Sequence, residues 1–67
     1  MKDYVKRIED ELAALQDKQD KLNKFFDTEI YNGLSDQKKN LLQAQFGAML
    51  AYSSILIERI RVEESED

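Results

Sequence analysis

The sequence contains no proline and only two glycines, Gly33 and Gly47, so little in it interrupts a long helix. One break stands out at Asn32-Gly33, because it is followed by Ser35, a preferred residue type for a helix N-cap. The sequence therefore predicts two helices separated by one short turn. The expected single domain 1–67 has a helix at about 2–30, a turn at 31–35, a helix at 36–62 and an acidic tail at 63–67.

Apolar residues in the first segment recur at steps of three and four. They are Val5, Ile8, Leu12, Leu15, Leu22 and Phe26, and Gln19 stands where another apolar residue is due. This spacing predicts a heptad-like seam along one helix face. The residues around it carry charges of both signs, which is typical of a solvated face.

The second segment is apolar around most of its circumference. Its three apolar lines are Leu41, Ala48, Ile55 and Val62; Leu42, Met49 and Leu56; and Phe46, Leu50, Ile57 and Ile60. A narrow polar stripe runs through Gln43, Gly47, Ser54, Glu58 and Arg61. The two helices match in length and the short turn makes them antiparallel neighbours, so the first helix covers only one face of the second. A helix that is apolar nearly all round is normally buried on several sides.

Chain length also favours self-association. A chain of 67 residues buries little apolar surface relative to the entropy lost on folding. The sequence has no cysteine for a disulfide, and neither His nor Cys for a structural zinc site. We therefore expect an all-α protein, an antiparallel two-helix hairpin that assembles into an oligomeric helical bundle. The pattern is compatible with a homodimer and with a homotetramer.

The distribution of charge excludes several classes of partner. The net charge is -4, and residues 63–67 alone contribute four negative charges, which leaves the rest of the chain neutral. Interspersed charges provide no basic face for duplex nucleic acid. No apolar run is long enough to span a membrane, and the N-terminus lacks the layout of a secretory signal. We expect a soluble intracellular protein with no duplex nucleic acid partner and no membrane partner.

The composition also disfavours catalysis. There is no His or Cys, and Ser35, Ser53 and Ser54 lack the sequence context of an activated nucleophile. The two glycines stand alone, so no glycine-rich phosphate loop is present. The sequence predicts a protein that is not an enzyme, with no catalytic residues, no metal site and no cofactor.

Aromatic residues gather close to the predicted turn. They are Phe25, Phe26, Tyr31 and Phe46. We expect ordinary core packing for this cluster.

Three polar residues, Gln45, Tyr52 and Arg59, interrupt the apolar arc of the second helix at intervals of seven. Two interpretations remain open. In the structural one, Gln45 and Gln19 set the register of a bundle, Tyr52 packs with its hydroxyl at the rim, and Arg59 pairs with a carboxylate such as Glu11. In the other, these residues line a ligand pocket at a junction between subunits. The ligand-binding candidates are then Tyr52 and Tyr4, which would stack on a flat ring, and Arg59, Arg7 and Lys21, which would meet a negative charge.

Much of the chain also resembles a known family. The residues that carry the resemblance are Tyr4 to Arg7, Glu11, Leu15, Lys21-Leu22, Phe25, Leu34, Leu41-Leu42, Gln45, Met49, Tyr52, Leu56 and Arg59. Over roughly residues 4–60 they resemble a family of small bacteriophage proteins first catalogued among crAss-like phages. The most distinctive part is the stretch 41–45 leading to Met49, Tyr52 and Arg59.

Compact helical phage proteins of this type are similar to anti-CBASS sponges, which oligomerise and sequester the cyclic nucleotide signals of bacterial immunity. The resemblance implies a viral immune-evasion protein of the host cytoplasm that binds a cyclic dinucleotide such as 3'3'-cGAMP without cleaving it. Arg59, Arg7 and Lys21 are then candidates for the phosphates, Tyr52 and Tyr4 for the bases, and Gln45 for a base edge. The alternative is a helical oligomeric adaptor that binds another protein through its apolar face.

Overall fold

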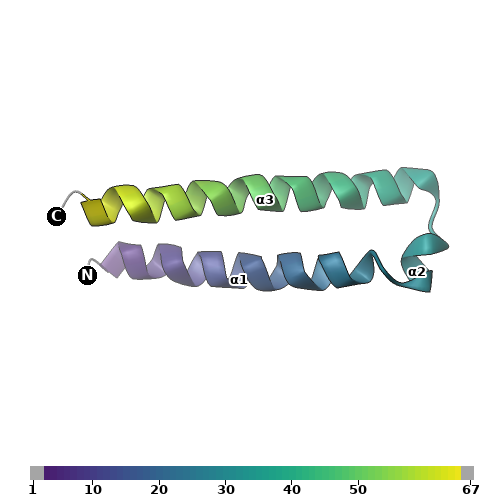
Figure 1. Cartoon of the computed structure of the whole chain (residues 1–67), viewed down its shortest axis with the longest axis horizontal. Coiled ribbons are helices and arrows are strands. Elements are labelled where there is room, and N and C mark those ends of the chain that lie inside the picture. The colour runs from purple at the N-terminus through teal and green to yellow at the C-terminus, as the bar shows by residue number, and fades with distance from the viewer. Residues whose placement is uncertain (1–2, 66–67) are drawn as a thin grey trace.

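The computed structural model describes residues 3–65, which form three helices (Figure 1). These are α1 (Asp3–Phe25), α2 (Glu29–Asn32) and α3 (Asp36–Ser65). The helices α1 and α3 pack side by side and run in opposite directions, and α2 closes one end (Figure 1). The result is a thin rod of 50 × 15 × 13 Å. The all-α prediction is confirmed for residues 3–65, which contain no strand.

The connection between the long helices differs from the prediction. The first helix was expected to reach about residue 30, but α1 ends at Phe25 and the short helix α2 follows. Thr28 causes the break: its Oγ1 donates to the carbonyl oxygen of Phe25 (2.7 Å) and accepts from the backbone N–H of Tyr31 (3.2 Å). One side chain thus closes α1 and caps α2.

The helix α3 begins where the sequence predicts. The Ser35 hydroxyl accepts a hydrogen bond from the backbone N–H of Lys38 at 3.3 Å, which confirms Ser35 as the N-cap. At the other end α3 runs to Ser65, so the prediction that 63–67 forms a tail outside the helix is wrong for residues 63–65. Residues 66–67 lie outside the described part of the chain.

The core between the long helices is one seam wide. Val5, Ile8 and Leu15 of α1 are buried, as the heptad-like spacing predicts. On α3, Leu56 is fully buried, and Met49 and Ile60 pack beside it with Leu12 of α1. Each helix therefore contributes only one face to the core.

A polar pair interrupts this seam near its middle. Gln19 and Ser53 are both buried, and the Gln19 Nε2 donates to the Ser53 Oγ at 2.7 Å. Sliding one helix along the other would separate the two groups and leave each buried without a partner, which is costly. The contact therefore favours one alignment of α1 on α3, which is consistent with the expected register role of Gln19.

This contact yields a stability prediction. Gln19→Ala leaves the Ser53 hydroxyl without its partner, so we expect the free energy of unfolding to fall by about 1–3 kcal/mol. The double variant Gln19→Leu with Ser53→Ala removes both polar groups and should be at least as stable as the parent. Urea unfolding at one fixed chain concentration measures both effects. If the free energy of unfolding fell equally in the single and the double variant, the effect of Gln19→Ala could not be assigned to the lost hydrogen bond.

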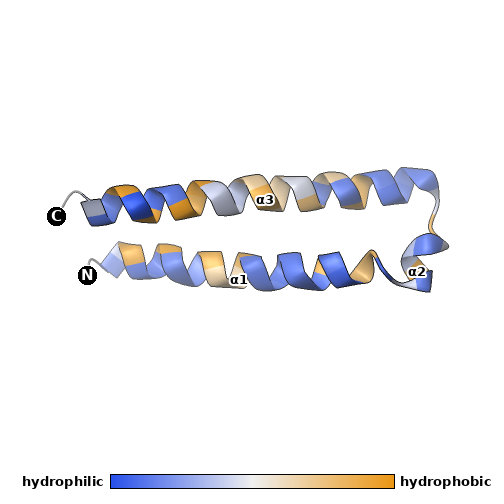
Figure 2. Cartoon of the chain, in the orientation of Figure 1, coloured by the Kyte–Doolittle hydropathy of each residue, from blue (hydrophilic) through white to orange (hydrophobic). Residues whose placement is uncertain are grey.

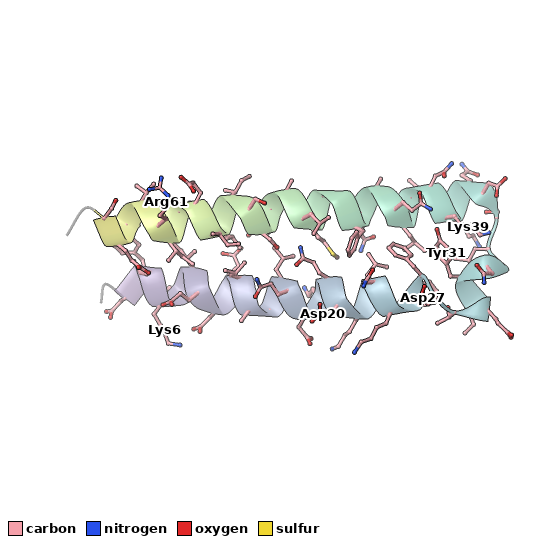
Figure 3. All side chains as sticks on the ribbon, viewed as in Figure 1. Lys6, Asp20, Asp27, Tyr31, Lys39 and Arg61 are labelled. Atoms are coloured by element: carbon pink, nitrogen blue, oxygen red, sulfur yellow. The ribbon has the colours of Figure 1, made fainter. Side chains whose placement is uncertain are left out.

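Aromatic side chains fill the closed end of the rod. Tyr31 is buried and meets Phe25 and Phe26 edge-on, with ring centroids 6.0 and 5.0 Å apart, and Phe26 meets Phe46 at 5.5 Å. The Tyr31 hydroxyl accepts a hydrogen bond from the Gln43 Nε2 at 2.7 Å. Figure 3 shows Tyr31 between the turn and α3. The prediction of core packing for this cluster is confirmed.

Candidate ligand-binding surface on α3

A second regular line of side chains lies on α3, outside the core. We call it the second seam; its members are Leu41, Gln45, Ala48, Tyr52, Ile55, Arg59 and Val62, and all seven are exposed. Each member directly precedes, in the sequence, a residue of the face that packs on α1. The second seam is therefore rotated by about 100° around the axis of α3 from that face. Figure 2 shows apolar bands over much of α3 but not at its start beside the turn, whereas α1 is mainly hydrophilic with fewer apolar bands.

The apolar members of the second seam are substantial. Leu41 is 66% exposed and Ile55 is 57% exposed, while neighbouring Leu56 is completely buried. Exposed leucine and isoleucine are ordinary when scattered, but a regular apolar line along a helix marks a contact surface.

The surface is hollowed near the open end of the rod. The depression has a volume of about 290 Å³ and faces solvent. Its lining comes entirely from α3: Ile55, Glu58, Arg59, Val62 and Glu63. Two branched apolar residues thus flank one guanidinium and two carboxylates.

Both carboxylates of the depression have partners. The Arg61 Nε donates to the Glu58 Oε1 at 3.0 Å, and this hydrogen bond, with the positive charge behind it, holds the pKa of Glu58 below its usual value. The Tyr4 hydroxyl donates to Glu63. Within residues 3–65, by contrast, no carboxylate lies within ion-pair distance of Arg59. Arg59 is therefore the cation of this site that remains available to an anion.

Comparison with known proteins assigns the chain to a family. A family model described as Sequestin matches residues 2–62. The chain belongs to the Sequestin family. The Sequestin match includes every residue that lines the depression except Glu63. The family name indicates a sequestering protein, hence a binding role rather than catalysis, and it names no ligand. No curated protein and no solved structure matches the chain.

In this chain, three of the six predicted ligand-binding residues share one line. Gln45, Tyr52 and Arg59 are all exposed on the second seam, about 10.5 Å apart along the helix axis. Sequence analysis expected them inside an apolar arc, but α1 covers a different face of α3. The expected ion pair between Arg59 and Glu11 is absent among the described residues, so that part of the structural interpretation is wrong.

The other three candidates lie on α1. Tyr4 is linked to the depression through Glu63. Arg7 and Lys21 are exposed and are not in its lining, and the Lys21 Nζ is paired with Asp17 at 2.9 Å. The structure therefore brings together Arg59 and Tyr4 at the open end, and does not bring Lys21 to them.

Sequence analysis did not select Glu58 and Glu63 as part of this surface. Glu58 was assigned to the polar stripe, and Glu63 to the tail. Glu58 and Arg61 are three residues apart, a spacing at which side chains on a helix commonly form an ion pair. This spacing could have indicated that Arg61, and not Arg59, pairs with Glu58.

Residues 3–65 contain no group of three acidic side chains placed to hold a metal ion. None of the helices in this stretch is long and apolar enough to cross a lipid bilayer.

Proposed function

We propose that this protein is a phage anti-CBASS sponge that binds a cyclic dinucleotide such as 3'3'-cGAMP in the host cytoplasm and withholds it from the immune effector. The observation that carries the proposal is the Arg59 guanidinium, which lacks a carboxylate partner among the described residues and lies between Ile55 and Val62 in the depression. The family name supports sequestration, and the resemblance to crAss-like phage proteins supports the viral origin and the ligand class.

The chemistry of the second seam suits such a ligand. A cyclic dinucleotide presents two phosphates and two flat bases. Arg59 would pair with a phosphate and Tyr52 would stack on a base. Gln45 of the same chain lies about 21 Å from Arg59 along the helix, so the amide that hydrogen-bonds to a base edge would come from another copy. The sequence has no His or Cys to activate water or to attack a phosphorus atom, which fits storage of the ligand without cleavage.

The size of the depression supports a site shared between copies. At about 290 Å³ it is at the small end of ligand pockets, which enclose roughly 300–1,000 Å³. Its walls come from a single helix, so a ligand there would keep one side in water. A second chain placed over the depression would supply the missing wall, which is how symmetric oligomers commonly form junction sites.

Titration calorimetry against a panel of cyclic di- and trinucleotides tests the proposal. We expect saturable binding of at least one cyclic dinucleotide at micromolar concentration and no comparable binding of its linear, hydrolysed form. Heating the complex should release the ligand intact, since it is held and not cleaved. An absence of binding across the panel would refute the sponge function.

A second function is favoured by a different part of α3. Leu50 and Ile57 are 49% and 50% exposed and lie seven residues apart, outside the second seam. If they stay exposed after self-association, they form an apolar line that suits an adaptor protein docking a partner helix. Failure of the nucleotide panel would favour this alternative.

A further inference from the structure

The second seam has the spacing of a coiled-coil contact. Its members follow one another at alternating steps of four and three residues over 41–62, and they alternate between a mainly apolar set and the polar set Gln45, Tyr52 and Arg59. Steps of four and three are what two helices need in order to pack along their whole length. The seam that α3 presents to α1 follows the same rule, so α3 is built to contact two helices at once.

The exposed surface area is large enough for a second copy of this chain to be the occupant. The protein exposes 5092 Å², whereas a compact monomer of 7.9 kDa exposes roughly 4,400 Å². The excess of roughly 700 Å² is close to the area that one partner contributes to a standard protein interface, about 800 Å². If the second seam packs against the second seam of another copy, both copies use the same surface, as a two-fold symmetric dimer requires.

Charge favours an antiparallel pairing of the two α3 helices. The N-terminal end of α3 carries Lys38 and Lys39, and its C-terminal end carries Glu63 and Glu64. Parallel helices would place like ends together and Arg59 against its own copy. Antiparallel helices place the basic end of each beside the acidic end of the other and oppose the helix dipoles.

The sizes of the side chains are consistent with a two-fold axis close to Tyr52. In that arrangement Leu41 lies opposite Val62 of the partner subunit, so two branched apolar residues meet. Ala48 lies opposite Ile55 of the partner subunit, so a small residue meets a large one. The same register brings Gln45 of the partner subunit across from Arg59.

We propose that two copies pair antiparallel through the second seam, about an axis at Tyr52, so that Gln45 of the partner subunit completes the site around Arg59. The identity of the ligand rests on the proposed function, whereas the pairing stands without it. The amide would close the open side of the depression with a group that both donates and accepts hydrogen bonds. Each pair then contains two equivalent sites, and neither is complete in a single chain.

Disulfide trapping in the absence of nucleotide tests the pairing. The chain has no cysteine, so single-cysteine variants can form disulfides only between copies. We expect Tyr52→Cys to cross-link with itself, and Leu41→Cys to cross-link with Val62→Cys when the two are mixed, with the mixed product identified by intact mass. Leu41→Cys alone and Val62→Cys alone should react no faster than Ala13→Cys, an exposed control on α1.

The other outcomes overturn the proposal. Rapid cross-linking of Leu41→Cys and of Val62→Cys each with itself would show parallel pairing. Cross-linking of all seam variants at the rate of the Ala13→Cys control would show that something other than a second copy covers this face.

Nucleotide binding then tests the shared site separately. Gln45→Ala should weaken binding of the cyclic dinucleotide about fivefold while leaving the trapping pattern unchanged, and the exposed control Gln37→Ala should have no effect. An unchanged affinity for Gln45→Ala would remove Gln45 from the site. If the expected cross-links form but no nucleotide binds, the sponge function is refuted and the antiparallel pairing is retained. If a cyclic dinucleotide binds but the cross-links show parallel pairing, the pairing is refuted and the sponge function is retained.

Discussion

Replacing Ile55 with aspartate is expected to dissociate the assembly and to abolish ligand binding with it. Ile55 is 57% exposed in the single chain, so the aspartate remains solvated there and the packing of α1 on α3 is retained. In the proposed assembly, the same position lies in the contact between copies, and in the single chain it lines the depression. The substitution therefore acts on the contact between copies and not on the fold of one chain.

The expected size of this effect follows from burial. Fully burying an isoleucine side chain contributes about 1.5–3 kcal/mol, and because Ile55 is 57% exposed the contact adds roughly half of this in each chain. A dimer loses this contribution twice, so the dissociation constant should rise by roughly twentyfold or more. Sedimentation velocity measures the change in mass, and circular dichroism checks that the helices persist. Ser54→Asp places the same charge on the adjacent exposed residue of the polar stripe and should leave the mass unchanged. An Ile55→Asp variant that keeps the parental mass would place the contact on another face of α3.

Replacing Arg59 with alanine is expected to weaken binding of the cyclic dinucleotide at least tenfold, with no change in oligomer mass. Hydrogen bonds to charged groups contribute about 1.5–3 kcal/mol, and a tenfold change corresponds to about 1.4 kcal/mol. Within residues 3–65 Arg59 has no ion-pair partner to lose, so its removal costs the free protein little. Titration calorimetry of parent and variant measures the difference.

Arg61→Ala is the matched control for this variant. Arg61 carries the same charge two residues away and points away from α1 (Figure 3). It is paired with Glu58 and is not in the lining of the depression. We expect its loss to change the affinity less than threefold, well under the effect of Arg59→Ala. Equal affinities for the parent and the Arg59 variant would show that the ligand binds elsewhere, with Arg7 and Lys21 on α1 the next cations to test.

Periodicity predicted the helices and the core well. The steps of three and four identified the buried residues Val5, Ile8 and Leu15, and Ser35 identified the start of α3. The end of α1 was missed because a threonine, and not a glycine or proline, produces it. Thr28 terminates a helix through two hydrogen bonds of its side chain, and propensity alone does not indicate that such bonds will form.

The candidate site was predicted in part. The seven-residue spacing correctly put Gln45, Tyr52 and Arg59 on one line. Their exposure was not foreseen, because spacing shows which residues share a face but not which face a neighbouring helix covers. The ion-pair partner of a charged residue is also poorly determined by sequence. One of the two interpretations paired Arg59 with a carboxylate such as Glu11, whereas the structure pairs the neighbouring Glu58 with Arg61.

The central claim is that α1 covers one face of α3 and that another copy of the chain covers the second seam. Sedimentation velocity of the parent protein without ligand, at several micromolar concentrations, tests this claim most directly. We predict a species whose mass is a multiple of 7.9 kDa and that dissociates only on dilution. A well-folded species of 7.9 kDa at every concentration would contradict the account, because the second seam would then remain in water and the shared site would not form.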